Sequence, residues 1–243
     1  TISAGGLLTL APGVEFHTKQ FSSTSSYNDV RVYGTLTATD VSFTHTTYAV
    51  DLLVYDGGQM DLTDSTFTAG NAVYAAGSSG IVNNGSGSWN LDIYDNQVSV
   101  TGGIDVNTLT LRDDVTVANG QIDVLNVYAT ATVTSSEIGY VSLYQGAAPV
   151  MTGNTLADDT PYRIADPDAD LTGIGSNTYS SADPRISVYG TLEGATTLGF
   201  VDGIGKYDHI SLLTISAGGL LTLAPGVEFH TKQPNSYSDY NDV

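Results

Sequence analysis

The sequence predicts an all-β chain wound as a parallel β-helix, a β-solenoid with roughly nine or ten turns per 213-residue unit. Three features of the sequence lead to this fold class. A segment at the start of the chain returns near its end, apolar residues recur in pairs two positions apart, and glycine-rich corners separate the pairs. This pattern is typical of many very short strands that stack turn upon turn.

The repeat is long and almost perfect. The segment TISAGGLLTLAPGVEFHTK that begins at Thr1 returns at Thr214, and a glutamine extends each copy by one position. Each copy then continues through a drifted stretch that ends in YNDV. The sequence therefore predicts one repeat unit at 1–213 and the start of the next, near-identical tandem unit at 214–243, in one continuous solenoid.

The opening segment shows how each turn is built. Its apolar residues form three pairs, which Gly5-Gly6 and Pro12-Gly13 separate. A pair two positions apart indicates a short strand with one face inward, and a Gly or Pro-Gly break indicates a corner. The same triplets recur in VRVYGTLTATDVSF and GIDVNTLTLRDDVTV, so we expect three short strands per turn. The first three pairs are Ile2/Ala4, Leu8/Leu10 and Val14/Phe16.

The spacing of the leading pairs favours a solenoid over other all-β folds. Ile104, Ile122 and Val141 each lead a pair, and they follow one another at nearly equal intervals. Three short strands in ~20 residues correspond to one solenoid turn. A sandwich or barrel would show longer strands joined by two-residue hairpin turns. Propeller blades have a period of ~40–45 residues and Trp-Asp signatures, whereas the only tryptophan is Trp89 in SGSWNLDI.

Several segments resemble the right-handed parallel β-helix repeat proteins of the pectate-lyase-like superfamily. LTISAGGLLTLAPGVEFHT and VRVYGTLTATDVSFTHT look like successive turns of that family, and ISVYGTLEG is similar to the second. Segments 64–67, 153–156 and 176–179 resemble corners in which stacked Asn or Ser side chains bridge successive turns. The resemblance implies a right-handed helix and a secreted or surface-anchored prokaryotic protein. The fold hosts lyases, hydrolases, adhesins and passive spacers, so it does not select a function.

The charge of the chain limits its partners and location. There are 26 acidic and 7 basic residues, a net charge of −19, and no cysteine. Nucleic acid and anionic membranes repel such a polyanion, so nucleic acid is not an expected partner. No apolar run approaches the ~18 residues of a membrane-spanning helix, so we expect no membrane insertion in this segment. An acidic exterior favours an extracellular or cell-surface location, which the resemblance also implies.

The sequence predicts no catalytic residue and no bound cofactor, and therefore no enzyme. Polysaccharide lyases of the resembled fold combine carboxylates that hold calcium with a Lys or Arg base. The basic residues of this chain are scattered along the sequence. The acidic pair Asp158-Asp159 has no histidine nearby and precedes Thr160-Pro161, which is typical of a turn.

One acidic segment is a candidate calcium site. In ADPDADLTG, Asp166, Asp168 and Asp170 alternate, and such a run can surround calcium as in the first half of an EF-hand loop. The segment lacks the glycine and the bidentate glutamate of that loop. An acidic surface loop stiffened by proline is the alternative interpretation.

Five tyrosines follow directly after an apolar pair and form a candidate aromatic surface stripe. If the pair faces inward, the next residue faces outward, and successive turns would align these rings. Such a stripe would bind sugars or pack laterally, or it is a stacking ladder that covers the sheet. The five residues are Tyr33, Tyr55, Tyr94, Tyr144 and Tyr189.

These observations predict a non-enzymatic structural repeat of an extracellular filament, stalk or cell-surface fibre. The near-identical repeat favours this class, because a stalk gains length with each added copy whereas an enzyme gains little. The expected partners are further copies of the unit, in tandem or end to end. The alternative is an adhesin or module that binds surface glycans, and a polysaccharide lyase or hydrolase ranks third.

Overall fold

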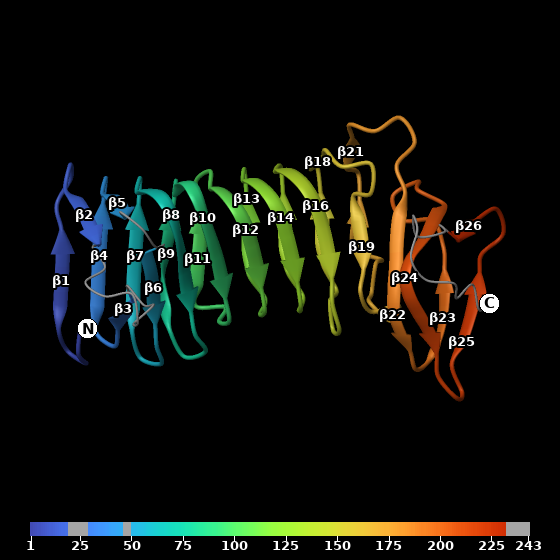
Figure 1. Cartoon of the computed structure of the whole chain (residues 1–243), viewed down its shortest axis with the longest axis horizontal. Helices are drawn as coiled ribbons and strands as arrows, with labels where there is room; N and C mark the ends of the chain where they lie inside the picture. Colours follow the sequence, from blue (N-terminus) through green and yellow to red (C-terminus); the bar gives the residue numbers. More distant parts are fainter. Residues whose placement is uncertain (19–28, 46–49, 232–243) are drawn as a thin grey trace.

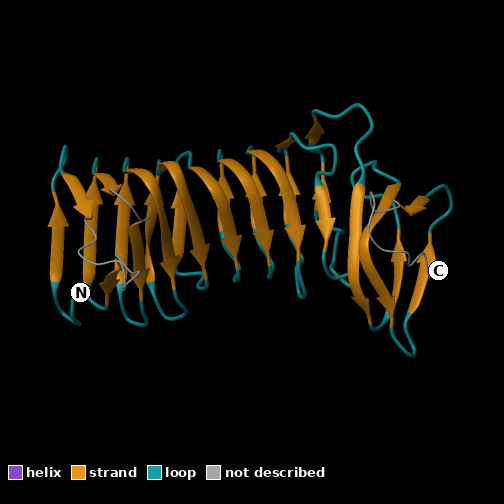
Figure 2. Ribbon diagram, viewed as in Figure 1, coloured by secondary structure: helices purple, strands orange, loops and turns teal. Residues whose placement is uncertain are grey.

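The computed structural model describes residues 1–18, 29–45 and 50–231. These residues form 26 strands and no helix, and the strands stack along one long axis (Figures 1 and 2). Neighbouring strands come from successive turns and pair in parallel, which confirms the predicted all-β parallel solenoid. Residues 19–28 and 232–243, which include the positions where the two copies of the repeat differ, lie outside the described residues.

One long sheet of 15 strands runs from the first turn to the last. Its continuous path begins at β2 and ends at β26, with β3, β6, β18 and β21 paired beside it. The strands on the path are β2 (Glu15–Thr18), β5 (Ser42–His45), β8 (Thr66–Tyr74), β10 (Ser86–Ile93), β12 (Asp105–Leu111), β14 (Gln121–Val127), β16 (Glu137–Leu143), β19 (Tyr162–Ile164), β22 (Ile186–Leu192), β24 (Lys206–Ile215) and β26 (Glu228–Thr231). The strands beside it are β3 (Asp29–Val32), β6 (Val50–Val54), β18 (Thr155–Leu156) and β21 (Thr178–Tyr179).

Three shorter sheets form a second wall of the solenoid. The first contains β1 (Leu7–Leu10), β4 (Thr35–Thr39), β7 (Gln59–Thr63), β9 (Ser79–Asn83) and β11 (Val98–Thr101). The second contains β13 (Thr116–Ala118), β15 (Thr132–Thr134), β17 (Val150–Thr152) and β20 (Ile174–Gly175). The third contains β23 (Ala195–Leu198) and β25 (Leu220–Leu223).

A left-handed residue turns the chain from the short sheets into the long sheet once in every turn. Its φ lies between 50° and 85°. Glycine adopts this conformation without a Cβ clash, and Asn and Asp tolerate it better than other residues. The corner residues are Gly13, Asp40, Asp64, Asn84, Gly102, Asn119, Ser135, Gly153, Ser176, Asp202 and Gly226.

The corners define the number and the length of the turns. Ten turns separate Gly13 from Gly226, which is the same residue in the second copy of the repeat, so the predicted nine or ten turns are confirmed. The shortest turn runs from Asn119 to Ser135, and the longest runs from Gly13 to Asp40. The turns therefore differ in length, and the register within the long sheet shifts at two places, between Gly87 and Trp89 and between Val188 and Gly190.

The predicted alignment of the pair leaders is wrong in one respect. Ile122 pairs with Val106 and Ile138 in the neighbouring turns, not with Ile104 and Val141. The reason is that two successive inward pairs lie on one continuous strand of the long sheet, such as β14. Either pair can then be taken for the leader when only the sequence is known.

The interior is a column of apolar side chains with an aromatic stack at its centre. The rings of Phe43 and Phe67 lie 4.7 Å apart, and those of Phe67 and Trp89 lie 4.5 Å apart, both nearly parallel. Phe16 of the first turn continues the stack at 5.7 Å from Phe43. The inward positions of β8 and β10 in this column are buried. Stacking of like side chains on successive turns therefore supplies most of the core.

Polar side chains bridge the turns at the inner side of the corner, as the resemblance implies. Asn154 is fully buried and accepts a hydrogen bond from the backbone N–H of Ser136 (3.0 Å). Its amide donates to the Oδ1 of Asn177 (3.0 Å) on the next turn. The backbone N–H of Asn177 in turn donates to Asp202 (2.8 Å). Four successive turns are thus linked through one corner.

The regular winding changes between residues 157 and 185. The single strand β16 is followed in the next turn by two strands, β18 and β19, because residues 157–161 loop out between them. Residues 180–185 separate β21 from β22 in the same way. Figure 1 shows this part projecting from the stack near β18 and β21. These two loops bring together the charged residues considered below.

Candidate functional site

In successive turns of the long sheet, the residue that directly follows the last inward residue of a strand faces outward. The backbone N–H of Tyr128 donates to the carbonyl of Leu111, and that of Tyr144 donates to Val127, so neighbouring members lie on adjacent turns. We call this column the outer ladder. It consists of Tyr33, Tyr55, Ala75, Tyr94, Arg112, Tyr128, Tyr144, Ala165 and Tyr189.

The outer ladder contains all five tyrosines of the predicted stripe and four residues that the prediction did not include, Ala75, Arg112, Tyr128 and Ala165. Tyr128 follows Val127 in the same pattern as the other five, so the sequence signal for it was present. Arg112 follows the apolar pair Leu109/Leu111 in the same way, but only the register of β12 against its neighbours places it between tyrosines.

Four tyrosines of the outer ladder stack in two pairs. The rings of Tyr33 and Tyr55 lie 4.6 Å apart at 10°, and those of Tyr128 and Tyr144 lie 4.2 Å apart at 4°. Each pair is stacked along the solenoid axis, so the ring faces meet and the edges point outward. A sugar stacks on a ring face, and in these pairs a neighbouring ring already covers one face of each tyrosine. This geometry favours a structural role, in which the stacked rings connect neighbouring turns.

Arg112 lies between Tyr94 and Tyr128 in the outer ladder and contacts both rings. Its guanidinium lies 4.6 Å from the ring centre of Tyr94 and 4.4 Å from that of Tyr128. Its Nε donates to Asp92 at 3.0 Å. Burial alone would lower the pKa of Arg112, but the hydrogen bond and the charge of Asp92 outweigh burial and raise it above its ordinary value. The guanidinium therefore stays charged between the two rings.

Replacing Arg112 with alanine should lower the free energy of unfolding by about 1–2 kcal/mol, from two cation–π contacts and one partly exposed ion pair. Arg112→Lys keeps the charge near Asp92 but loses the planar group, so it should recover only part of this loss. Urea denaturation of the two variants measures both values. A lysine variant as stable as the parent would contradict the stacking role.

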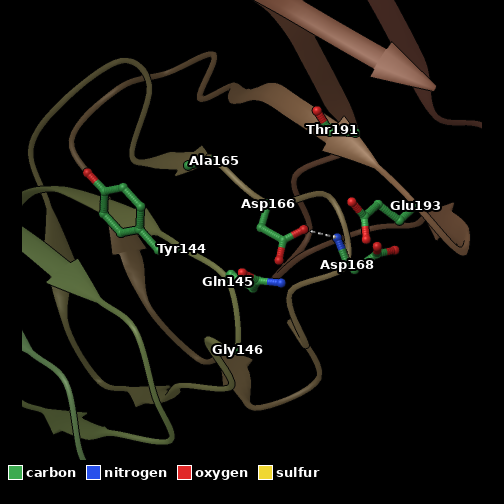
Figure 3. A pocket seen from close by; sticks show the side chains of 8 residues that line it. All are labelled: Tyr144, Gln145, Gly146, Ala165, Asp166, Asp168, Thr191 and Glu193. Atoms are coloured by element: carbon green, nitrogen blue, oxygen red, sulfur yellow. Dashed lines mark hydrogen bonds between the residues drawn. The ribbon is translucent and has the colours of Figure 1, made fainter. Parts of the chain in front are cut away.

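A cleft of about 510 Å³ lies beside the outer ladder where Ala165 replaces a tyrosine (Figure 3). Its lining residues are Tyr144, Gln145, Gly146, Ala165, Asp166, Asp168, Thr191 and Glu193. Two of the three predicted calcium ligands, Asp166 and Asp168, thus lie in this cleft, and Asp170 lines a different pocket. The segment folds as a turn, because the N–H of Ala169 donates to the carbonyl of Asp166.

The three aspartates each accept hydrogen bonds from different groups. Asp166 accepts from the N–H of Asp168 at 3.1 Å, and Asp168 accepts from the hydroxyl of Thr196. Asp170 accepts from the N–H and the hydroxyl of Thr172, which lower its pKa. Among the residues that the structure describes, no group of three or more His, Cys, Asp or Glu side chains is arranged to hold a metal ion. The three candidate calcium ligands are not brought together.

The melting temperature is expected to be the same in chelator and in millimolar calcium. Binding to the folded state would raise it by mass action, but a calcium ion here would first have to break the hydrogen bonds of Asp166, Asp168 and Asp170. Differential scanning calorimetry measures the difference. A rise that Asp166→Asn and Asp168→Asn abolish would show that the predicted site exists after all.

Three basic residues that are scattered in the sequence lie close together on neighbouring turns. Arg185 pairs with Asp183 (3.0 Å) and Asp208 (3.1 Å), and Lys206 pairs with Asp183 (2.6 Å). Hydrogen bonds donated by Lys206 and then Arg185 lower the pKa of Asp183, and the hydrogen bonds that Arg185 donates to Asp183 and Asp208 raise the pKa of Arg185. Arg163 likewise pairs with an aspartate, Asp158 (3.1 Å).

This arrangement corrects the interpretation of the basic residues as isolated, and it argues against a catalytic base. A general base has to be unprotonated near neutral pH so that it can accept a proton, and the raised pKa of Arg185 keeps the guanidinium protonated. The cleft beside it has a volume of about 390 Å³ and is lined by Asp159, Thr160, Ser181, Ala182, Asp183 and Arg185.

The repeated segment forms the same structure at both ends of the solenoid. β25 and β26 have the sequences of β1 and β2, LLTL and EFHT, with identical bounds within the repeat. We call 1–18 the first terminal turn and 214–231 the last terminal turn. Their inward side chains, such as Phe16 and Phe229, are only partly buried, whereas Phe43 one turn inside is buried. Each terminal turn is covered by a neighbouring turn on one side.

The comparisons with known proteins identify no relative. No family model, no curated protein and no solved structure matches the chain. In the part of the chain that the structure describes, no helix could span a membrane.

Proposed function

We propose that this chain is a non-enzymatic structural repeat of an extracellular filament, stalk or cell-surface fibre built from serial β-helix units. One observation carries the proposal: the path through the long sheet begins and ends with strands of the same sequence, EFHT, in β2 and β26. A solenoid that returns to its starting turn can continue with a further copy, because each turn contacts only its neighbours.

The two copies of the repeated turn are covered on opposite sides. In the first terminal turn, the later side is covered, with Leu8 paired to Leu36. In the last terminal turn, the earlier side is covered, with Phe229 paired to Tyr207. Inside a tandem array, one repeated turn would be covered on both sides. The first terminal turn shows the contact on the later side, and the last terminal turn shows the contact on the earlier side. A junction between units needs no contact beyond these.

Phe200 supports a junction of this kind. Its ring lies over the Pro-Gly corner of the last terminal turn, because a Cβ on Gly226 would lie 3.6 Å from the ring. A Cβ on the equivalent Gly13 would meet nothing within 4 Å. In an array, the equivalent phenylalanine of the preceding unit would cover this open corner.

The array is tested by its axial repeat. Ten strand spacings of about 4.8 Å separate β2 from β26, so each unit should advance about 48 Å. For a chain with two units in series, 1–213 followed by 1–243, the maximum dimension of the monomer, measured by small-angle X-ray scattering at high dilution, should exceed that of the monomeric single chain by about this length. Electron microscopy of native material should show the same period. An unchanged maximum dimension would contradict the proposal.

We further propose that the protein belongs to the pectate-lyase-like superfamily and is exported by a prokaryote. The bridging corner asparagines and the net charge of −19 support this assignment. We expect no depolymerisation of pectate, alginate or a glycosaminoglycan, because Arg163, Arg185 and Lys206 are already paired with aspartates. Turnover that is lost in an Arg185→Ala variant would overturn the non-enzymatic assignment.

Glycan binding is the competing function, and the outer ladder is where it would occur. The stacked pairs Tyr33–Tyr55 and Tyr128–Tyr144 reduce the ring area that a sugar could contact. We therefore rank adhesion below the structural role.

A further inference from the structure

We propose that two chains join by exchange of a terminal turn, in which residues 214–231 of one chain replace residues 1–18 of another on the turn formed by 29–45. The inference deepens the proposed function by naming a second copy of this chain as the partner. It depends on the same repeated turn as the tandem array, but it concerns association between separate chains.

The replacement preserves every contact of the displaced segment, because the two segments have the same sequence. In the first terminal turn, β1 pairs with β4 and β2 pairs with β5, each over four residues. The hydroxyl of Thr44 donates to Glu15 (2.8 Å) and also contacts His17 (2.9 Å). Glu228 and His230 of the incoming chain would take these positions. The last terminal turn meanwhile keeps its own contacts with β23 and β24.

The incoming segment gains a neighbouring turn on the side that the described residues of its own chain leave uncovered. Leu223, which faces inward as Leu10 does, is 42% exposed in the last terminal turn. After exchange it would pack against Ala38, as Leu10 does by register. The displaced first terminal turn regains the conformational freedom of about 18 residues, which offsets the translational entropy lost on association. Domain swapping is a low-cost route to association for this reason.

Direct stacking of the last terminal turn on an intact first terminal turn is less favourable than exchange. It would place the carboxylate of Glu228 beside that of Glu15, and like charges directly opposite each other in a sheet destabilise it. After exchange, Glu228 lies beside Ser42, as Glu15 does in the closed chain. The first terminal turn can also open locally, because a turn covered on one side is at the low-stability end of a solenoid.

Engineered cysteines can test this directly, because the natural chain has none. Thr9 and Thr37 are neighbours in register, and Thr222 is the copy of Thr9. β4 and β25 lie near opposite ends of the solenoid, so cysteines introduced at positions 37 and 222 could not meet within one chain (Figure 1). Directly opposite residues on paired strands are about 4.8 Å apart at Cα, which is within the range that a disulfide spans.

The variant Thr37→Cys/Thr222→Cys should form disulfide-linked dimers and larger oligomers as protein concentration rises, and each single-cysteine variant should not form the larger oligomers. Thr9→Cys/Thr37→Cys provides the matched control, because its disulfide fixes the first terminal turn within each chain. In that control the oligomers seen by light scattering should be lost under oxidising conditions and return on reduction.

Cross-linking in Thr9→Cys/Thr222→Cys without cross-linking in Thr37→Cys/Thr222→Cys would overturn exchange in favour of direct stacking. A monomer at every concentration would overturn association altogether. Neither result would change the expected maximum dimension of the two-unit chain. That measurement therefore tests the structural role separately.

Discussion

Replacing Trp89 with alanine is expected to lower the free energy of unfolding by about 3–5 kcal/mol, the range for large aromatic residues in cores. Trp89 lies in β10 and is fully buried. Its ring stacks on Phe67 at 4.5 Å and 9°, in the central aromatic stack of the solenoid. Its Nε1 donates to the carbonyl of Asp105 on the next turn at 2.9 Å. One substitution therefore removes core volume, a ring contact and a bond between turns.

The residues packed around Trp89 can fill only part of the cavity that the alanine substitution would leave. A Cβ on Gly85 would lie 2.8 Å from the indole, so the ring is packed closely against that backbone. A well-packed site collapses only partly around a cavity, which places the cost toward the upper part of the range. Chemical denaturation followed by far-ultraviolet circular dichroism measures the loss, since the variant has no tryptophan fluorescence.

Two further variants separate the contributions of Trp89. Trp89→Phe keeps a ring on Phe67 but loses the N–H donor and some volume, so its midpoint should fall between those of the parent and the alanine variant. Leu7→Ala, at a side chain that is 70% exposed, should change the free energy by less than about 0.5 kcal/mol. An alanine variant of Trp89 with the parent midpoint would show that the central stack does not hold the turns together.

The fold class was predictable because the apolar period is a local feature of the sequence and the repeat can be read directly from it. Period-two pairs and glycine corners specify short strands wherever they occur, and ten turns of unequal length still obey that rule. The alignment between turns was less predictable. Val106 and Leu109 are both inward residues of the single strand β12, so each could head a turn when only spacing is considered.

The candidate site was predictable only in part. The tyrosines after apolar pairs lie in one column because the residue after an inward position faces outward. The calcium prediction compared the D-x-D-x-D segment with the first half of an EF-hand loop, in which alternate carboxylates surround one ion. Residues 166–169 instead form a turn, so each carboxylate bonds to a different partner. The grouping of Arg163, Arg185 and Lys206 depends on loops 157–161 and 180–185, whose paths no periodic pattern specifies.

Replacing Asn154 with alanine is expected to lower the free energy of unfolding by about 2–5 kcal/mol, because it leaves buried hydrogen-bonding groups without partners. Asn154 is fully buried at the inner side of the corner. Its Oδ1 accepts from the N–H of Ser136, and its Nδ2 donates to the carbonyl of Val133 (2.9 Å) and to Asn177. An alanine satisfies none of these groups.

The adjacent residue provides a matched control. Thr155 occupies the next position of the same corner and faces solvent, and its hydroxyl bonds to that of Thr178 at 3.0 Å. Thr155→Ala should change the free energy by less than about 0.5 kcal/mol. Equal losses in the two alanine variants would show that burial of the amide does not matter at this corner.

Asn154→Asp tests the direction of the hydrogen bonds through its pH dependence. The introduced carboxylate can still accept from Ser136, but it faces the carbonyl of Val133 and the Oδ1 of Asn177, both of which are acceptors. Burial and these oxygens should raise the pKa of the introduced carboxyl in the folded state above its unfolded value. Stability should then be greatest below the unfolded pKa, where the neutral acid donates as the amide did, and it should be lost as the pH rises through the folded pKa. Denaturation midpoints between about pH 3 and pH 7, compared with those of the parent at each pH, measure this difference. A variant whose stability relative to the parent does not fall with rising pH would contradict the bridging geometry of the corner.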